Sequence, residues 1–405
     1  MMKRTKALSA EQKAGKNIIT VLVCTLFLLN AAVTDGKTSV RKKGFSCNGL
    51  RSMARVYMAY GDYTKAQPFV EQALSLAKKT NASNSQLASC LIDLAYVYEK
   101  QGKLVLAEKM CDMGLKLQEK AYYKTHPYVA MTLRILSTIY QGQGKYRQAM
   151  PLLDRAMTIM RKNHPTDEQA TAPFQVDIAN LLTAQGNFAQ AETYFLQAIE
   201  SLNKSYGPKH LYTAGVLGDL ARLYMLQGRY DEAEKLIEQT LPIQEKIYGP
   251  EHHLLAPTWL TMAGIYQSKK NYTQAETLLQ KALITVEKKQ GAEHPLTGRI
   301  LSRLGELYLA EKQYTQADDV CRKAVKVLEN SLGADNDCTA IAFNNLARLY
   351  IHQGKYAEAQ ELCQKALDTL ENTLGRNHPN VIKVLETMAQ LNNRTEKTIK
   401  VAKLD

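Results

Sequence analysis

The sequence repeats itself at a nearly constant interval. The segment LARLYMLQGRYDEAEKLIEQTL at 220–241 returns almost unchanged as LARLYIHQGKYAEAQELCQKAL at 346–367. A short turn marks eight copies, at Gly61, Gly102, Gly144, Gly186, Gly228, Lys270, Lys312 and Gly354. The sequence numbers of successive markers differ by 41 once and by 42 six times. A fixed period in this range is typical of solenoids and related repeat architectures.

Each copy contains two apolar patterns of helical period, separated by the turn. In the fifth copy we expect helices at about residues 210–227 and 232–247, with Gly228 just after the first, where glycine readily adopts a left-handed backbone. The second helix carries alanine at one early position in all eight copies: Ala66, Ala107, Ala149, Ala191, Ala233, Ala275, Ala317 and Ala359. Small residues let helices approach closely. The sequence therefore predicts helical hairpins that bury their apolar faces by stacking on one another.

This pattern resembles the tetratricopeptide repeat (TPR). The family's order of Trp, Leu, small residue and Tyr, followed by two alanines, is present, and Trp259 lies at the family's Trp position. The 42-residue period and the GxxHP segments, as at 291–295 and 375–379, are similar to repeats of the kinesin-light-chain type. The resemblance covers about residues 44–391 and implies an all-α, right-handed TPR superhelix, an α-solenoid of about eight hairpins. Kinesin light chains carry a long heptad region before their repeats, and its absence here argues against a motor subunit.

The repeats dominate the predicted organisation of the chain. We assign residues 46–378 to eight repeats, 379–391 to a capping helix that would shield the last apolar face from water, and 392–405 to a polar tail. This leaves no room for a separate catalytic domain, so an enzyme is the least favoured class. No P-loop, zinc-protease, nucleophile-elbow or EF-hand pattern is present. We therefore expect no catalytic residue, no metal site and no cofactor.

The first 45 residues differ from the repeats. MMKRTKALSAEQKAGKN carries five Lys/Arg and one acid, and IITVLVCTLFLLNAAV at 18–33 is uncharged and mostly apolar. A basic segment before an apolar stretch is typical of an export signal, whereas a membrane-spanning helix usually needs about 20 residues. We expect 1–34 to be a signal peptide or, alternatively, an N-terminal membrane anchor, followed by a basic linker at 35–45. The repeats would then be exported, periplasmic or secreted, or tethered on the exported side; a cytosolic chain with a buried apolar helix is the third alternative.

The formal net charge of +13 does not indicate nucleic-acid binding. Residues 1–45 carry nine Lys/Arg and two acids, whereas the rest of the chain carries 43 Lys/Arg and 37 acids. The repeats therefore have a mixed surface without a long basic run. The basic N-terminal segment fits membrane topology or anionic lipid headgroups. We expect no nucleic-acid partner and a membrane association only through 18–33.

Cysteine and histidine follow the repeat. Cys111, Cys321 and Cys363 share one position that is apolar in the other copies, so we expect them to fill the core. In an exported protein, paired cysteines would be the usual framework. Histidines recur on successive linkers, where they cannot surround one metal ion: His126, His210, His252, His294 and His378. The proline that follows three of them suits the first turn of a helix.

The resemblance places a binding surface on the first helix of each hairpin. It implies that these helices line a concave groove and that positions beside the Leu-small pair face a bound segment. The expected binding residues are Arg51, Arg55, Asp93, Arg134, Asp177, Asn180, Asp219, Arg222, Arg303, Asn344, Asn345 and Arg348. Asparagine can pair with a peptide backbone, and arginine can pair bidentately with carboxylates. The sequence thus predicts a non-catalytic scaffold that binds protein or peptide segments, with acidic segments suited to its arginines. The alternative is a structural protein that associates with itself through its ends or edges.

Overall fold

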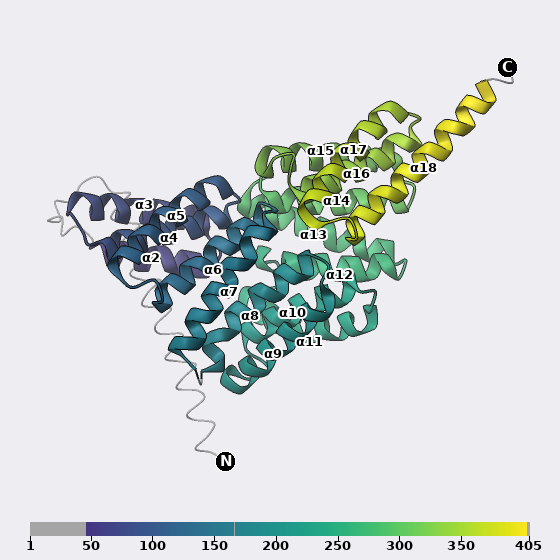
Figure 1. The fold of residues 1–405 in the computed structure, drawn as a ribbon. Helices are drawn as coiled ribbons and strands as arrows, with labels where there is room; N and C mark the ends of the chain where they lie inside the picture. Colours follow the sequence, from purple (N-terminus) through teal and green to yellow (C-terminus); the bar gives the residue numbers. More distant parts are fainter. Residues whose placement is uncertain (1–45, 166, 403–405) are drawn as a thin grey trace, which may run out of the picture. The chain divides into compact units, whose positions relative to one another are not determined.

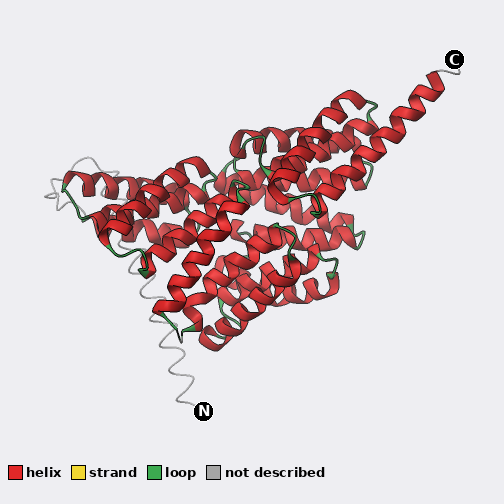
Figure 2. Cartoon of the chain, in the orientation of Figure 1, coloured by secondary structure: helices red, strands yellow, loops and turns green. Residues whose placement is uncertain are grey.

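The structure, a computed structural model, describes residues 46–165 and 167–402. This part of the chain is helical throughout, with no strand among the described residues (Figure 2). The helices are α2 (Cys47–Ala59), α3 (Tyr63–Lys79), α4 (Asn84–Lys100), α5 (Leu104–Ala121), α6 (Pro127–Gly142), α7 (Tyr146–Asn163), α8 (Glu168–Ala184), α9 (Phe188–Tyr206), α10 (Leu211–Leu226), α11 (Tyr230–Tyr248), η1 (His253–Leu255), α12 (Ala256–Ser268), α13 (Tyr272–Gln290), α14 (Pro295–Ala310), α15 (Tyr314–Leu332), α16 (Asp337–His352), α17 (Tyr356–Leu374) and α18 (Pro379–Ala402).

Consecutive helices form eight hairpins, which stack in chain order (Figure 1). Hairpin one is α2 with α3, hairpin eight is α16 with α17, and α18 covers the end of the stack as a single helix. Each second helix packs against the first helix of the next hairpin. The predicted all-α solenoid of eight hairpins and a cap is confirmed.

The turn inside each hairpin adopts the predicted left-handed backbone. Glycine at six of the turn positions and lysine at the other two have φ between 60° and 78°. This conformation reverses the chain directly after the first helix. Lys270 and Lys312 adopt the same conformation, and both are exposed.

The linkers between hairpins end in a polar residue that caps the next helix. The Nδ1 atoms of His126, His210, His294 and His378 accept a hydrogen bond from the backbone N–H two residues further on, at 3.1–3.2 Å. The Oδ1 atom of Asn336 does the same at 2.9 Å. A cap of this kind satisfies an N–H group that has no partner within the helix. The linker histidines therefore act as N-caps, a role that the sequence analysis did not assign to them.

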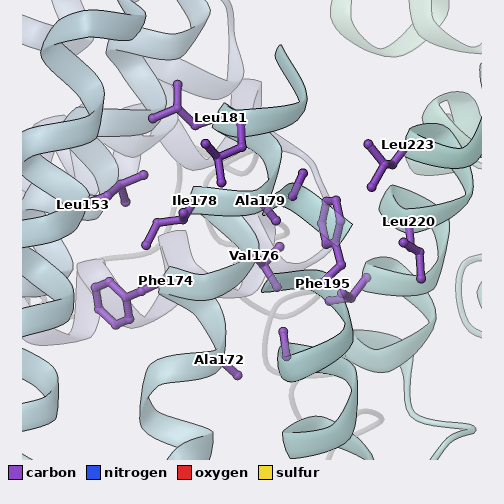
Figure 3. Close-up of a cluster of buried hydrophobic side chains, with 14 of the residues drawn as sticks. Leu153, Ala172, Phe174, Val176, Ile178, Ala179, Leu181, Phe195, Leu220 and Leu223 are labelled. Atoms are coloured by element: carbon purple, nitrogen blue, oxygen red, sulfur yellow. The ribbon is translucent and has the colours of Figure 1, made fainter. Parts of the chain in front are cut away.

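The core runs along the stack between neighbouring hairpins. The eight alanines early in the second helices are fully buried, as are Cys111 and Cys363, and Cys321 is almost so. Phe174 of α8 and Phe195 of α9 belong to the largest cluster, which continues through Leu220 and Leu223 of α10 (Figure 3). Each hairpin thus buries its apolar face against its neighbours, and the prediction that these cysteines fill the core is confirmed.

The capping helix at the C-terminal end is longer than predicted, and the predicted N-terminal segments are not described by the structure. The capping helix continues past Leu391 to Ala402 and includes most of the predicted polar tail. The physical reason is that residues 392–402 contain neither glycine nor proline to stop the helix. The predicted signal or anchor at 1–34 and the linker at 35–45 lie outside the described residues. None of the helices that are described is both long and apolar enough to cross a membrane.

Candidate interaction surface

The first helices lie on the inner side of the stack. Each of them except α12 contacts the first helix of the next hairpin, or the cap, as well as its own partner. Contacts between α12 and α14 and between successive second helices are marginal at most. Closer spacing on one side of a curved stack identifies that side as the inner one. The side chains that the sequence analysis selected on first helices therefore belong to the inner surface of the repeats.

Several of these side chains pair with one another between neighbouring hairpins. Arg51 of α2 donates from Nε to Oδ2 of Asp93 on α4 at 2.6 Å, and Arg134 of α6 makes the same contact with Asp177 on α8. Arg55 lies further from Asp93, at 3.4 Å, and is mostly exposed. Arg51, Asp93 and Asp177 are largely buried by these contacts. In the first four hairpins, most of the predicted binding charges therefore pair with each other.

A second group joins α8 and α10. Asn180 accepts a hydrogen bond from Arg222 at 2.8 Å and donates to Asp219 at 3.3 Å. Burial raises the pKa of Asp219, and the neighbouring Arg222 and Asn180 oppose this rise. Burial also lowers the pKa of Arg222, and Arg299 and Arg303 on α14 lower it further. Since α14 lies two hairpins beyond α10, inner side chains from different hairpins influence one another across the inner surface.

Asn344 and Asn345 do not face a surface. Both are buried in α16, with about 6% and 4% of their area exposed. The Nδ2 atom of Asn345 donates to the backbone oxygen and the hydroxyl of Ser302 on α14, both at 3.1 Å. The structure therefore uses Asn345 to hold two first helices together, and neither amide is available to a bound segment. Both were expected on the binding surface because they stand beside the Leu-small pair. The tight packing of α16 on α14 covers these positions instead.

Positive charge gathers near the end of the stack, where the sequence analysis placed Arg303 and Arg348. Arg303 donates to Glu306 at 3.0 Å, and Lys383 on α18 approaches the other oxygen of the same carboxylate at 3.5 Å. Burial alone would raise the pKa of Glu306, but Arg303, Lys383 and Arg348 together lower it to about 2. Three cations thus share one carboxylate, and we call these four side chains the cationic cluster. Arg348 forms no ion pair with any acid in the described part of the chain.

Hairpins that are far apart in sequence touch along a line that we call the turn seam. The turn glycines of hairpins one to four lie against the linkers that start hairpins six, seven and eight and the cap. The four pairs are Gly61 with His253, Gly102 with Pro295, Gly144 with Asn336, and Gly186 with His378. In the first three pairs, the linker begins the hairpin that lies five places after the hairpin of its glycine. In the fourth pair, the linker begins the cap. The contact therefore repeats regularly along the stack.

Hydrogen bonds reinforce the turn seam. The Nε2 atom of His294 lies 3.1 Å from the backbone oxygen of Lys100, and Nδ2 of Asn336 donates to the oxygen of Gly142 at 3.0 Å. The hydroxyl of Tyr146 donates to Asp337 at 2.8 Å, and Lys289 pairs with Asp62 at 2.8 Å. His294 and Asn336 thus cap a helix through one atom and bridge two distant hairpins through another.

The turn seam was not predicted from the sequence, and neither was the position of Lys383 in the cationic cluster. A signal for the seam did exist, because all four seam turns are glycine while lysine occurs only in hairpins six and seven. The described residues contain no group of three His, Cys, Asp or Glu side chains that could hold a metal ion. The chemistry of the inner surface is therefore that of ion pairs and hydrogen-bonding side chains.

Comparison with known families agrees with this architecture. A family model described as "Tetratricopeptide repeat" matches residues 171–246, 213–261, 254–330, 297–355 and 338–400, which together span more than half of the chain. A second model, described as "MalT-like TPR region", matches residues 47–203. Among curated proteins, none matches the sequence.

Solved structures show the same fold at low identity. A Rap protein complexed with competence and sporulation factor is 13% identical, with 87% of this chain and 98% of that chain covered and a TM-score of 0.55. A chain of the APC/C hetero-tetramer Cut9–Hcn1 is 15% identical, with 86% of this chain and 57% of that chain covered and the same TM-score. A putative kinesin light chain of Podosopora anserina with TPR-like repeats is 24% identical over 49% of this chain and 95% of its own, with a TM-score of 0.39. The first two support the fold, and the third is too distant in structure to support an argument.

Proposed function

Because the chain belongs to the tetratricopeptide repeat family, we propose that it is a non-catalytic scaffold whose inner surface binds an acidic segment of a partner protein. The observation that carries this proposal is the cationic cluster. Arg303, Arg348 and Lys383 come from three successive inner helices, α14, α16 and α18, and share only Glu306. The predicted binding residues of hairpins one to five are largely paired with one another, and Asn344 and Asn345 of hairpin eight are buried.

The geometry of the cationic cluster suits a carboxylate from outside. Arg348 has no ion-pair partner among the described acids, and Lys383 is more than half exposed and lies 3.5 Å from Glu306. Arginine can bind a carboxylate through two parallel hydrogen bonds. The interaction would be stronger here than on an open surface, because the cluster is partly shielded from water. An Asp or Glu side chain of the partner would complete the charge balance that Glu306 leaves incomplete.

The Rap and Cut9 structures are complexes by their titles, one with competence and sporulation factor and one of Cut9 with Hcn1. These partners belong to those proteins. The two complexes support the proposal in one respect: a stack of hairpins with this fold can present a binding surface to a second protein or peptide. A fold of this kind hosts many functions, so the proposed partner class depends on the cationic cluster alone.

The test is a binding titration with a defined probe. A fluorescently labelled oligo-glutamate peptide and an oligo-lysine peptide of equal length are titrated against the full chain. We expect only the acidic peptide to bind, with an affinity that falls as salt rises. A charge-assisted hydrogen bond contributes about 1.5–3 kcal/mol, so Arg348→Ala should weaken binding roughly tenfold or more.

Two further variants make this titration specific. Glu306→Gln removes the competing carboxylate and should strengthen binding of the acidic peptide, although the protein becomes less stable. Lys235→Ala, on the exposed face of the second helix α11, is the matched control and should bind like the wild type. Equal affinities for wild type, Arg348→Ala and Lys235→Ala would contradict the proposed site.

We also propose that residues 1–34 export the repeats or tether them to a membrane on the exported side. The support is the sequence of the basic segment followed by the apolar stretch at 18–33. A phosphatase that is active only outside the cytoplasm, fused after Lys43, should be active. Charge at the centre of the apolar stretch costs about 2.5–3.5 kcal/mol per residue, so Leu26→Arg with Leu28→Arg should abolish that activity. An inactive wild-type fusion that accumulates as soluble, full-length protein would contradict export.

One observation favours the alternative that the protein associates with itself. Ile382 and Leu385 project from α18, and each has almost half of its surface exposed. Spaced three residues apart, they lie on one face of the helix. Self-association through this face should disappear in the double variant Ile382→Lys, Leu385→Glu. Sedimentation of wild type and variant over a range of concentrations tests it, and a wild type that stays monomeric at high concentration excludes it.

A further inference from the structure

Two cysteine sulfur atoms lie 3.4 Å apart at the start of the stack. They belong to Cys47 of α2 and Cys90 of α4, the first helices of hairpins one and two. Cys90 is fully buried, whereas Cys47 is partly exposed, and both are free thiols. A disulfide bond is about 2.05 Å long, so the two sulfurs need to approach by roughly 1.4 Å to bond.

The repeat pattern shows that Cys47 is not ordinary core filling. The position of Cys47 is alanine or glycine in each of the other seven hairpins: Ala88, Ala130, Ala172, Ala214, Ala256, Gly298 and Ala340. All seven are buried, so a residue without a reactive group meets the packing requirement there. By contrast, the position shared by Cys111, Cys321 and Cys363 holds large apolar residues in the other copies, so these three cysteines fill the core. Packing therefore does not explain why hairpin one has a cysteine at the position of Cys47.

A buried ion pair fixes the distance between the two helices beside the thiols. Arg51 lies one helical turn after Cys47, and Asp93 lies three residues after Cys90. Arg51 and Asp93 bond at 2.6 Å and both side chains are mostly buried. Residues three or four apart lie on one face of a helix, so the ion pair sits directly beside the thiols. It holds α2 against α4 in the register that keeps the sulfurs together.

From this geometry we infer that Cys47 and Cys90 form a redox-controlled disulfide that fastens α2 to α4. The oxidant is an external disulfide, either of a small thiol or of a thiol-disulfide oxidoreductase. The partly exposed Cys47 thiolate attacks one sulfur of that disulfide, forms a mixed disulfide and releases one thiolate. The Cys90 thiolate then attacks the sulfur of Cys47 and displaces the second thiolate. The two cysteine protons pass to the two released thiolates, so the external disulfide is reduced to two thiols.

The environment of the two thiols supports this order of attack. Burial, together with the neighbouring Cys47, raises the pKa of Cys90 to about 12, and Arg51 opposes the rise. A thiol of such high pKa is a poor first nucleophile at neutral pH. Once Cys47 carries the mixed disulfide, however, Cys90 reacts with a sulfur that it already touches. Its high effective concentration then compensates for its low thiolate fraction.

The consequence of the disulfide is mechanical. Within the described residues, hairpin one stacks on hairpin two alone, apart from the seam contact of its turn with hairpin six. Terminal repeats of solenoids open more easily than internal ones. The disulfide would close a long loop of the chain that contains the whole of α3. Closing a loop of this length restricts the open state substantially. Oxidation should therefore suppress the opening of α2 and α3 and leave the distant hairpins as they were.

The experiment uses the full chain, reduced and then exposed to oxidised glutathione. Intact mass should fall by the mass of two hydrogen atoms, and a digest should yield a cross-linked peptide pair containing Cys47 and Cys90. Hydrogen exchange in α2 and α3 should slow by about tenfold or more on oxidation, with α16 and α17 unchanged. The change should reverse on reduction.

The variants are chosen from residues that the repeats already use. Cys47→Ala and Cys90→Val reproduce the residues found at these positions in other hairpins, and each should abolish both the mass change and the slower exchange. Cys363→Val, a buried thiol in hairpin eight, is the matched control and should retain both. A stable glutathione adduct at Cys47 without the cross-link would overturn the inference, and so would a cross-link that leaves the exchange of α2 and α3 unchanged.

Discussion

The turn seam can be tested by adding one methyl group at a single glycine. Gly102 and Gly354 occupy the same turn in hairpins two and eight, with φ of +73° and +74°. A Cβ at Gly102 would lie 2.6 Å from Cγ of Pro295 and closer still to Cδ, whereas a Cβ at Gly354 meets nothing within 4 Å. Gly102→Ala and Gly354→Ala therefore share the same backbone strain and differ only in the contact with a distant hairpin.

The expected magnitudes follow from this difference. Alanine in the left-handed region costs about 1–2 kcal/mol in both variants. Overpacking against a rigid neighbour costs about 1–3 kcal/mol more, and the ring of Pro295 cannot rotate away. Separation of the seam would also lose the hydrogen bond between His294 and Lys100, worth about 1 kcal/mol. We expect Gly102→Ala to be less stable than Gly354→Ala by about 1–3 kcal/mol.

Two measurements check this prediction. Urea unfolding compares the stability of the two variants, and small-angle X-ray scattering compares their dimensions. Gly102→Ala should be the less stable and the more expanded, and Pro295→Ala added to it should recover part of the loss. If both glycine variants lose the same stability and scatter alike, successive turns of the stack do not touch in solution and the seam is refuted.

Three further predictions concern the interior and the cationic cluster. Burial, with His252 and Lys289 beside it, lowers the pKa of His253 from 6.5 to about 4. The unfolded chain therefore binds the proton more tightly than the folded chain. The free energy of unfolding should be highest above pH 6.5 and should fall by about 3 kcal/mol as the pH drops to 4. Urea unfolding at several pH values measures this loss, and His253→Gln should show a flatter profile. Asn345→Ala should lower the free energy of unfolding by about 1–3 kcal/mol because it leaves Ser302 without its partner, and an unchanged midpoint would contradict that role. Arg348→Ala should leave the melting temperature nearly unchanged, because it breaks no ion pair, and a large fall would place Arg348 in the core instead.

The repeat period made the fold predictable from the sequence. Helix type, the turn at Gly228, the stacking on alanine and the capping helix all follow from local pattern, since each hairpin depends mainly on its neighbours. The capping helix ran longer than expected because no helix-breaking residue follows Leu391. The boundaries of the other hairpins could be predicted from the pattern of a single repeat.

The inner surface was predicted less completely, for a physical reason. The repeat pattern identifies which face of a helix points inward, but it does not say which charges pair with each other. Arg51 and Asp93 neutralise one another, and Asn345 is covered by the packing of α16 on α14. The turn seam joins turns and linkers from opposite halves of the stack. Its geometry depends on the accumulated rotation of five hairpins, which no single repeat specifies.

The central claim is that a partner segment lies on the inner surface beside the cationic cluster. The most direct test places a photo-crosslinking amino acid at residue 348 of the full chain, and in a second protein at residue 235 on the outer helix α11. Both proteins are expressed in the cells from which the chain comes, irradiated and analysed by mass spectrometry. We predict that residue 348 captures a partner peptide rich in Asp and Glu and that residue 235 does not. Capture of the same peptide from residue 235 alone, or from both positions with equal yield, would contradict the claim.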